Sequence, residues 1–228
     1  MADKQSILLI YPPVAKPCEP PAGIARLAGV LRAGGIDCRV VDASLEGILD
    51  LLDYPLAADD TWSRRALKHR EANRLALRAP ALYGNPDRYK RAVMDLNRIL
   101  QMAGRAAGVT LSLANYGSPA LSTVRSRDLL TAAETFETNP FFPSFSARLA
   151  TLFDERAPDI VGLSINFMSQ ALSAFAMIGF IKKRFPRTRV ICGGGLVTSW
   201  MHIPGFKNPF QGLVDELLAG PGEQRLLD

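Results

Sequence analysis

Short, largely apolar runs lie near both ends of this chain, and each has the length of one strand. They cover residues 6–11, 38–43, 159–165 and 189–193. Such runs are typical of strands buried on both faces of a parallel sheet, whereas half-buried strands alternate apolar and polar residues. We therefore predict a central parallel sheet. Residues 213–219 are predicted to form its last strand, although this segment also fits a short helix.

Segments with helical periodicity separate these strands. The first, 23–33, has apolar residues at the spacing i, i+3, i+4 and i+7, and two glycines suited to ending a helix follow it. We predict a second helix capped by Ser44 and a long one over 169–185, before Pro186. Strands that alternate with helices predict an α/β fold, a doubly wound parallel sheet with right-handed crossovers.

A long insertion, about 56–140, separates the two halves of this pattern. Helices are predicted over 61–78, 86–107, 126–136 and, just beyond it, 143–156, and alternation over 109–114 predicts a half-buried strand. One apolar stripe on the second helix comprises Tyr89, Val93, Leu96, Leu100 and Ala103. We therefore expect one domain, 1–228, with a folded, mainly helical insertion.

The composition is that of an ordinary globular protein, with 48% hydrophobic and 21% charged residues, so a disordered or fibrous chain is excluded. The longest nearly apolar run, 171–181, is shorter than the roughly 20 residues that cross a bilayer. The apolar run 7–10 is too short for a signal peptide. We expect a cytoplasmic protein that does not contact a membrane.

Positive charge is concentrated in the insertion. Residues 56–110 hold 11 Lys and Arg against 5 Asp and Glu, whereas the whole chain has a net charge of +5. No nucleic-acid-binding motif accompanies these charges. We expect a solvated face or a contact with an acidic domain rather than a nucleic-acid partner.

Residues that usually carry catalysis are sparse. Cys18, Cys38 and Cys192 have neither CxxC nor CxxxCxxC spacing, so no zinc or iron–sulfur site of the chain's own is predicted. Cys38 and Cys192 fall inside apolar strands, where burial is expected. The HExxH, GxSxG and phosphate-loop motifs are absent from the sequence. The sequence therefore predicts no metal ligands and no complete catalytic centre.

Candidate binding residues follow the predicted strands. In an open α/β sheet, ligands bind beyond the carboxyl ends of the strands, where the strand order changes direction. Four segments lie at that edge. They are the proline-rich segment 12–23, the segment 166–170 with polar and large apolar residues, the glycine triplet 193–195 and the loop 220–223. The glycine triplet either lets a flat ligand approach the backbone or only makes a tight turn, and the sequence leaves both interpretations open.

Four of these segments occur in a characteristic order. They are PPAGIARLAGVLRAGG at 20–35, PDIVGLSI at 158–165, CGGGLVT at 192–198 and VDELLAGPGE at 214–223. Together they resemble the N-terminal cobalamin (B12)-binding domain of B12-dependent radical S-adenosylmethionine (SAM) proteins, over about 1–55 and 145–228. The resemblance implies a flavodoxin-like (Rossmann-like) sheet with cobalamin across its carboxyl edge and the nucleotide tail beside the strand that ends at Ser164.

The resemblance also implies which residues bind the cofactor. Ser164, Asn166 and Ser169 would make polar contacts, and Gly193, Gly194 and Gly195 would let the dimethylbenzimidazole lie against backbone. Thr198, Gly220, Gly222 and Glu223 would border the nucleotide. A 4Fe-4S cluster and S-adenosylmethionine are expected only in a C-terminal radical SAM domain of the same polypeptide, which this chain, as a fragment, would lack.

Two departures from the family pattern leave alternatives open. The DxHxxG motif is absent, which implies binding without a histidine ligand, or no binding. Pro221 stands where the family usually has glutamate. The main alternative is a flavodoxin-like scaffold or protein-interaction module with an empty, degenerate site. A flavin- or nucleotide-binding domain is disfavoured because the phosphate loop is missing.

Overall fold

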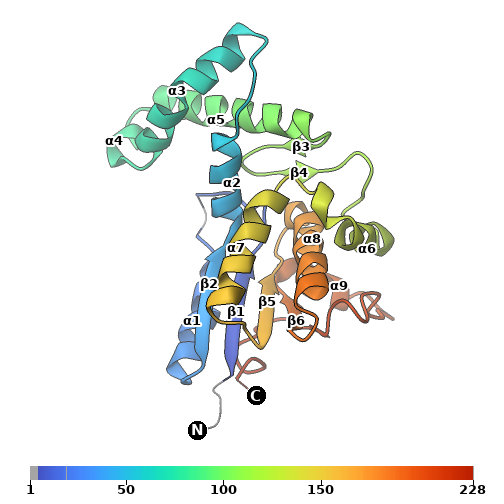
Figure 1. Ribbon diagram of the computed structural model, residues 1–228. Helices are drawn as coiled ribbons and strands as arrows, with labels where there is room; N and C mark the ends of the chain where they lie inside the picture. Colours follow the sequence, from blue (N-terminus) through green and yellow to red (C-terminus); the bar gives the residue numbers. More distant parts are fainter. Residues whose placement is uncertain (1–4, 19, 228) are drawn as a thin grey trace.

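The computed structural model describes residues 5–18 and 20–227, and its centre is a five-stranded, all-parallel sheet with the order β2-β1-β5-β6-β7 (Figure 1). The strands are β1 (Ser6–Tyr11), β2 (Asp37–Asp42), β5 (Ile160–Ser164), β6 (Arg189–Gly193) and β7 (Glu216–Leu217). Numbered along the chain within this sheet, the order is 2-1-3-4-5, that of flavodoxin-like folds. The predicted doubly wound parallel sheet is confirmed, and its order changes direction between β1 and β5.

Helices cover both faces of the sheet (Figure 1). They are α1 (Ala22–Ala33) on one face, and α2 (Ala43–Asp53), α7 (Phe142–Glu155) and α8 (Met168–Arg184) on the other. Along β1, Leu8 and Ile10 belong to the larger core, whereas Ile7 and Leu9 belong to the smaller core on the α1 side. No helix in the described part of the chain is long and apolar enough to cross a membrane.

The α1 face of the sheet has less cover than the other face. α1 packs over β1 and β2, and the segment after β7 crosses the same face without forming a helix within its described residues, 218–227. Leu226 of this segment is buried in the smaller core. Space therefore remains beside α1, above β5 and β6.

The predicted bounds of the last strand are wrong. Only Glu216 and Leu217 pair with β6, whereas the sequence predicts a strand over 213–219. The backbone N–H of Val214 donates to the carbonyl of Phe210 (2.9 Å), so the chain is still turning at that point. The short helix α9 (Gly195–Met201), which was not predicted from the sequence, begins at the last glycine of the triplet.

Asp42, not the predicted Ser44, caps α2. Its carboxylate accepts a hydrogen bond from the N–H of Leu45 (2.9 Å), which satisfies a donor of the first helical turn. The hydroxyl of Ser44 accepts a hydrogen bond from the N–H of Ala15 (2.9 Å) instead. Ser44 therefore fixes the proline-rich segment after β1 rather than the start of the helix.

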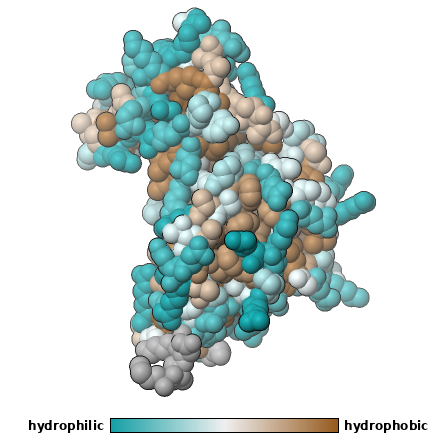
Figure 2. Space-filling model, viewed as in Figure 1, coloured by the Kyte–Doolittle hydropathy of each residue, from teal (hydrophilic) through white to brown (hydrophobic). Residues whose placement is uncertain are grey.

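The insertion begins with a helical lobe that projects from the sheet at the upper left of Figure 1. It consists of α3 (Thr61–Leu77), α4 (Pro80–Tyr83) and α5 (Pro86–Ala106). The Asp95 carboxylate, almost fully buried, holds α3 against α5 by accepting from Trp62, Arg65 and Asn73. Hydrophilic residues cover most of the lobe's visible surface (Figure 2).

The apolar stripe of α5 is confirmed in part. Leu96 and Leu100 are buried, and Ala103 is buried beside them. Tyr89, in the first turn of α5, is 38% exposed and packs against the ring of Tyr83 (ring centroids 5.6 Å apart). The stripe therefore packs inward from its second turn onward.

The rest of the insertion returns to the sheet. The predicted single strand is a hairpin of β3 (Thr110–Leu111) and β4 (Tyr116–Gly117), and α6 (Ser126–Glu134) is followed by the short 3-10 helix η1 (Phe136–Thr138). The backbone of α6 comes so close to α8 that a Cβ on Gly179 would lie 1.9 Å from the carbonyl oxygen of Ala133. The insertion is therefore packed into the larger core.

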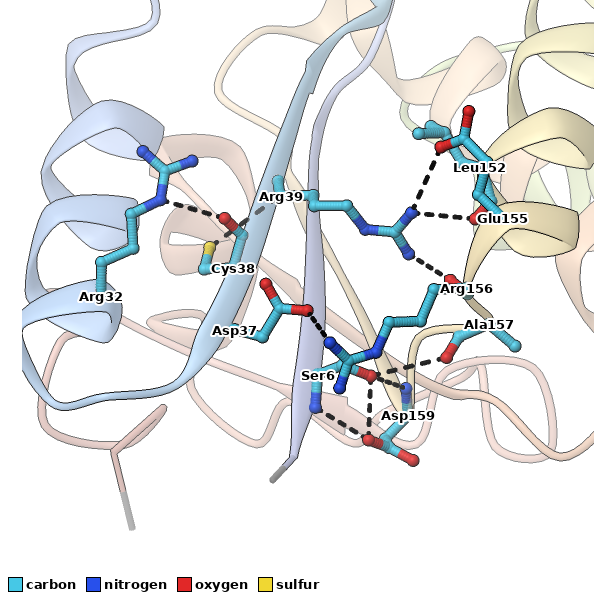
Figure 3. Close-up of polar contacts among 10 residues, drawn as sticks. All are labelled: Ser6, Arg32, Asp37, Cys38, Arg39, Leu152, Glu155, Arg156, Ala157 and Asp159. Atoms are coloured by element: carbon cyan, nitrogen blue, oxygen red, sulfur yellow. Dashed lines mark hydrogen bonds and ion pairs between the residues drawn. The ribbon is translucent and has the colours of Figure 1, made fainter. Parts of the chain in front are cut away.

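Polar side chains fasten β1 and β2 to the end of α7 at the amino edge of the sheet (Figure 3). Arg39 of β2 donates to two backbone carbonyls at the end of α7. Arg156 lies 2.6 Å from the carboxylate of Asp37, and Asp159 accepts from the N–H of Ser6 (2.8 Å). These contacts stabilise the edge opposite the carboxyl ends of the strands.

Candidate functional site

A cavity of about 300 Å³ opens on the α1 face of the sheet, where the strand order changes direction. Its floor comes from alternate residues of adjacent strands, which share a face because strand side chains alternate. These residues are Leu9 of β1, Gly162 and Ser164 of β5, and Ile191 and Gly193 of β6. Gly162 is paired with Leu9 and Ile191, and Ser164 with Gly193. Gly193 leaves open space in this floor, whereas the Leu9 side chain fills the space beside Gly162, 2.8 Å from where a Cβ would lie.

α1 and the segment after β7 form the walls. The apolar wall residues are Ile24, Leu27, Leu218 and Leu226. At the mouth, Nε of Arg26 lies 2.7 Å from a carboxylate oxygen of Glu223, and the two side chains are 76% and 21% exposed. The cavity therefore has an apolar interior and an ion pair at its rim.

Ser164 and Asn166 place polar groups at the carboxyl end of β5. The side-chain amide of Asn166 donates to the hydroxyl oxygen of Ser164 (3.1 Å) and accepts from the N–H of Gly195 (3.0 Å). No residue within 5–18 and 20–227 accepts a hydrogen bond from the Ser164 hydroxyl. A free donor beside an apolar floor suits a flat, mostly apolar ring with an acceptor atom at its edge.

The buried side chain of Gln170 fixes the turn that carries Asn166. Its amide oxygen accepts from the N–H groups of Asn166 (2.8 Å) and Phe167 (3.1 Å), and its amide nitrogen donates to the carbonyl of Pro12 (2.8 Å). Pro12 follows β1 and Asn166 follows β5. One side chain thus links the two strands between which the sheet order changes direction.

Seven of the ten predicted binding residues line this cavity: Ser164, Asn166, Gly193, Gly194, Gly220, Gly222 and Glu223. The other three do not. Ser169 donates to the carbonyl of Val14 (2.8 Å), Gly195 begins α9, and the hydroxyl of Thr198 accepts from the N–H of Gly220 (3.0 Å). Thr198 therefore supports the rim by holding the loop after β7, without facing the cavity.

The structure separates two glycines that the sequence leaves equivalent. Gly194 has a φ of +106°, and a Cβ there would lie 2.5 Å from the carbonyl oxygen of Ile165. Gly194 is therefore required by the turn itself. At Gly193 the nearest atom to an added Cβ would be the carbonyl oxygen of Leu218, at 3.5 Å, an ordinary contact. Gly193 is the position where the absence of a side chain leaves usable space.

Several lining residues were not singled out from the sequence. Gly162 and Ile191 lie two positions before Ser164 and Gly193, so the alternation of a strand could have identified them. Arg26 gives no local signal, because its place at the rim depends on how α1 packs beside the segment after β7.

The thiols do not face the cavity. Cys192 alternates into the larger core, and burial raises its pKa, so the thiol stays protonated. Cys38 is also buried, with its pKa raised mainly by desolvation, and Cys18 is exposed. The predicted burial of Cys38 and Cys192 is confirmed. Within the described ranges no group of three or more His, Cys, Asp or Glu side chains is placed to hold a metal ion.

Comparisons with known proteins identify no relative: no family model, no curated protein and no solved structure matches the chain. The function is therefore inferred from the sheet, the cavity and the chemistry of the residues that line it.

Proposed function

We propose that this chain is a cobalamin-binding domain that holds the nucleotide tail of the cofactor in the cavity beside α1, for use by a radical SAM domain. The open floor of that cavity carries the proposal, because Gly193 leaves space at the point of the sheet where ligands of such folds bind. The segments that resemble cobalamin-binding domains also supply the floor, the turn and the rim, which supports the same assignment.

The lining residues fit the nucleotide tail, which consists of a flat benzimidazole, a ribose and a phosphate. The apolar floor suits the faces of the ring, and the free hydroxyl of Ser164 suits an acceptor nitrogen at its edge. Arg26 would offer a cation to the phosphate at the rim. Glu223 already pairs with Arg26 (2.7 Å), so a bound phosphate would share this guanidinium.

The proposed binding uses no histidine ligand to cobalt. His69 on α3 and His202 after α9 are exposed, and neither lines the cavity. When bound, cobalamin would supply a cobalt centre for chemistry completed by the partner domain. The residues of this chain bind and orient the cofactor: Gln170 fixes the turn, and Thr198 fixes the loop after β7.

The proposal is tested by incubating the purified protein with hydroxocobalamin, desalting it, and recording the absorption spectrum. We expect retained corrin bands for the natural chain. Gly193→Val should fold with nearly unchanged melting temperature, yet lose at least tenfold in affinity, or about 1.4 kcal/mol, because its methyl groups enter the cavity. Gly29→Ala, on α1 with open space around it, is the matched control.

Two results would contradict the proposal. A colourless protein after both oxidising and reducing incubations would favour the scaffold with an empty site. A Gly193→Val variant that binds as tightly as the natural chain would remove this cavity from the binding site.

A further inference from the structure

A second cavity, of about 530 Å³, lies on the other side of the turn that carries Asn166. Its lining comes from the loop of the insertion that follows β4 and from the start of α8: Asn115, Ser118, Thr123, Arg125, Met168 and Ser169 are among its residues. Asn166 borders the first cavity, and Met168 and Ser169 border the second. The two cavities are therefore separated by only a few residues at the carboxyl end of β5.

The second cavity offers unused hydrogen-bonding groups. The side-chain amide of Asn115 and the hydroxyl of Thr123 have no partner within the described ranges 5–18 and 20–227. The cation Arg125 and the carboxylate Asp128 both line the cavity, so their charges balance. A neutral ligand group that both donates and accepts hydrogen bonds matches this lining better than an anion does, because an anion would meet the carboxylate.

The loop that carries these groups is fixed in place. The carboxylate of Asp128 accepts from the N–H of Ser122 (2.9 Å), and the hydroxyl of Ser118 accepts from the N–H of Ala120 (3.2 Å). Thr110 donates to the carbonyl of Gly117 (3.0 Å) at the base of the loop. Binding would therefore require little ordering of the chain, which favours affinity.

Exposed apolar side chains lie between the two cavities. Phe167 and Met168, at the start of α8, are 43% and 55% exposed although the helix behind them is buried. A single ligand that occupied both cavities would cover these two side chains. It would combine an apolar ring system with neutral polar groups at its rim.

We infer that the insertion completes the cofactor site: the second cavity binds the carboxamide side chains at the rim of the corrin, while the first binds the nucleotide tail. The inference rests on the proposed cobalamin function and assigns a role to the loop 115–123, which lies outside the segments that resemble cobalamin-binding domains. The corrin ring, apolar on its faces and rich in neutral amides at its edge, has the chemistry that Phe167, Met168, Asn115 and Thr123 together would recognise.

The test compares two corrinoids, hydroxocobalamin and cobinamide, which lacks the nucleotide tail. Binding constants are measured by absorbance titration for the natural chain, the double variant Asn115→Ala/Thr123→Val, and Gly193→Val. The double variant should weaken the binding of both corrinoids by the same factor, about tenfold, because it removes contacts to the corrin ring that both share. Gly193→Val should weaken hydroxocobalamin alone. Gln101→Ala, an exposed change on α5 with no described partner, should weaken neither.

The outcomes separate this inference from the function on which it rests. If the natural chain binds neither corrinoid, the proposed function itself fails. If it binds both and the double variant is unchanged, the cobalamin function stands and the second cavity is not part of the site. If the double variant weakens hydroxocobalamin but not cobinamide, the loop contacts the tail rather than the corrin, and the inference is overturned.

Discussion

Replacing Gln170 by methionine should destabilise the fold more than any single hydrogen bond can account for. Gln170 is fully buried, and its amide satisfies three backbone groups, the N–H of Asn166, the N–H of Phe167 and the carbonyl of Pro12. Methionine conserves the volume, so packing changes little. A buried group left without a partner costs about 1–3 kcal/mol; the bond to the carbonyl of Pro12 is buried and those from the two N–H groups are partly buried, so the variant should lose about 3 kcal/mol.

The assay is urea unfolding followed by circular dichroism. The dependence of the unfolding free energy on urea concentration must be the same in each variant, so that the midpoints report stability. Ser169→Ala is the reference, because it removes a single hydrogen bond to the carbonyl of Val14 from the neighbouring position and should cost about 1 kcal/mol. The reasoning is refuted if Gln170→Met loses no more unfolding free energy than Ser169→Ala does. Equal losses would mean that water replaces the amide of Gln170, and the two strands would then not depend on it.

Three further predictions concern stability and use the same assay. Gly179→Ala should destabilise by about 1–3 kcal/mol or more, since its Cβ would meet the backbone of α6, whereas Gly29→Ala should stabilise by about 0.5–1 kcal/mol; a loss in both would contradict this. Leu96→Ala should cost about 2–5 kcal/mol and the exposed Arg91→Ala almost nothing, so equal midpoints would refute the packing of α5. Burial alone would raise the pKa of Asp215, but hydrogen bonds from Lys182 (2.6 Å) and from the N–H of Val190 (2.7 Å) outweigh this effect and hold the pKa below 3.8. The stability that Asp215→Asn loses should therefore be greatest at neutral pH and should disappear as the pH falls below 3.8. A stability difference that stays constant from about pH 7 to about pH 2 would argue against this ion pair.

The sequence predicts best those parts of the fold in which a pattern of apolar residues extends over a whole strand or helix. The run 7–11 is apolar because alternate side chains of β1 face the smaller core beside α1 and the larger core on the other face of the sheet. Short elements behave differently. α9 has seven residues and starts at the third of three consecutive glycines, so local preference alone predicts a turn there. Only two residues form β7, and their pairing is imposed by β6.

The candidate site was predictable as far as it depends on strand ends. Ser164 and Gly193 follow from the rule that ligands bind at the carboxyl edge, and the structure places them on paired positions of neighbouring strands. Gly193 and Gly194 can be distinguished only from the structure. A side chain at Gly194 would meet the carbonyl of Ile165, whereas one at Gly193 would enter the open cavity. The second cavity was not predictable, since its residues come from the insertion and from α8, which are far apart in the chain.

The contacts that attach α3 to the rest of the protein determine how easily this helix unfolds locally. Its apolar side packs on α5, and its links to α2 include the ion pairs of Arg70 and Arg74 with Asp53 and a hydrogen bond from Arg70 to the carbonyl of Leu52 (2.8 Å). Few apolar contacts would be lost if α3 came away, so its amide hydrogens should exchange with solvent through local openings, well before those of β1 or β5. The helical lobe would then act as a separate cooperative unit, whose sequence can vary without weakening the sheet that carries the binding site.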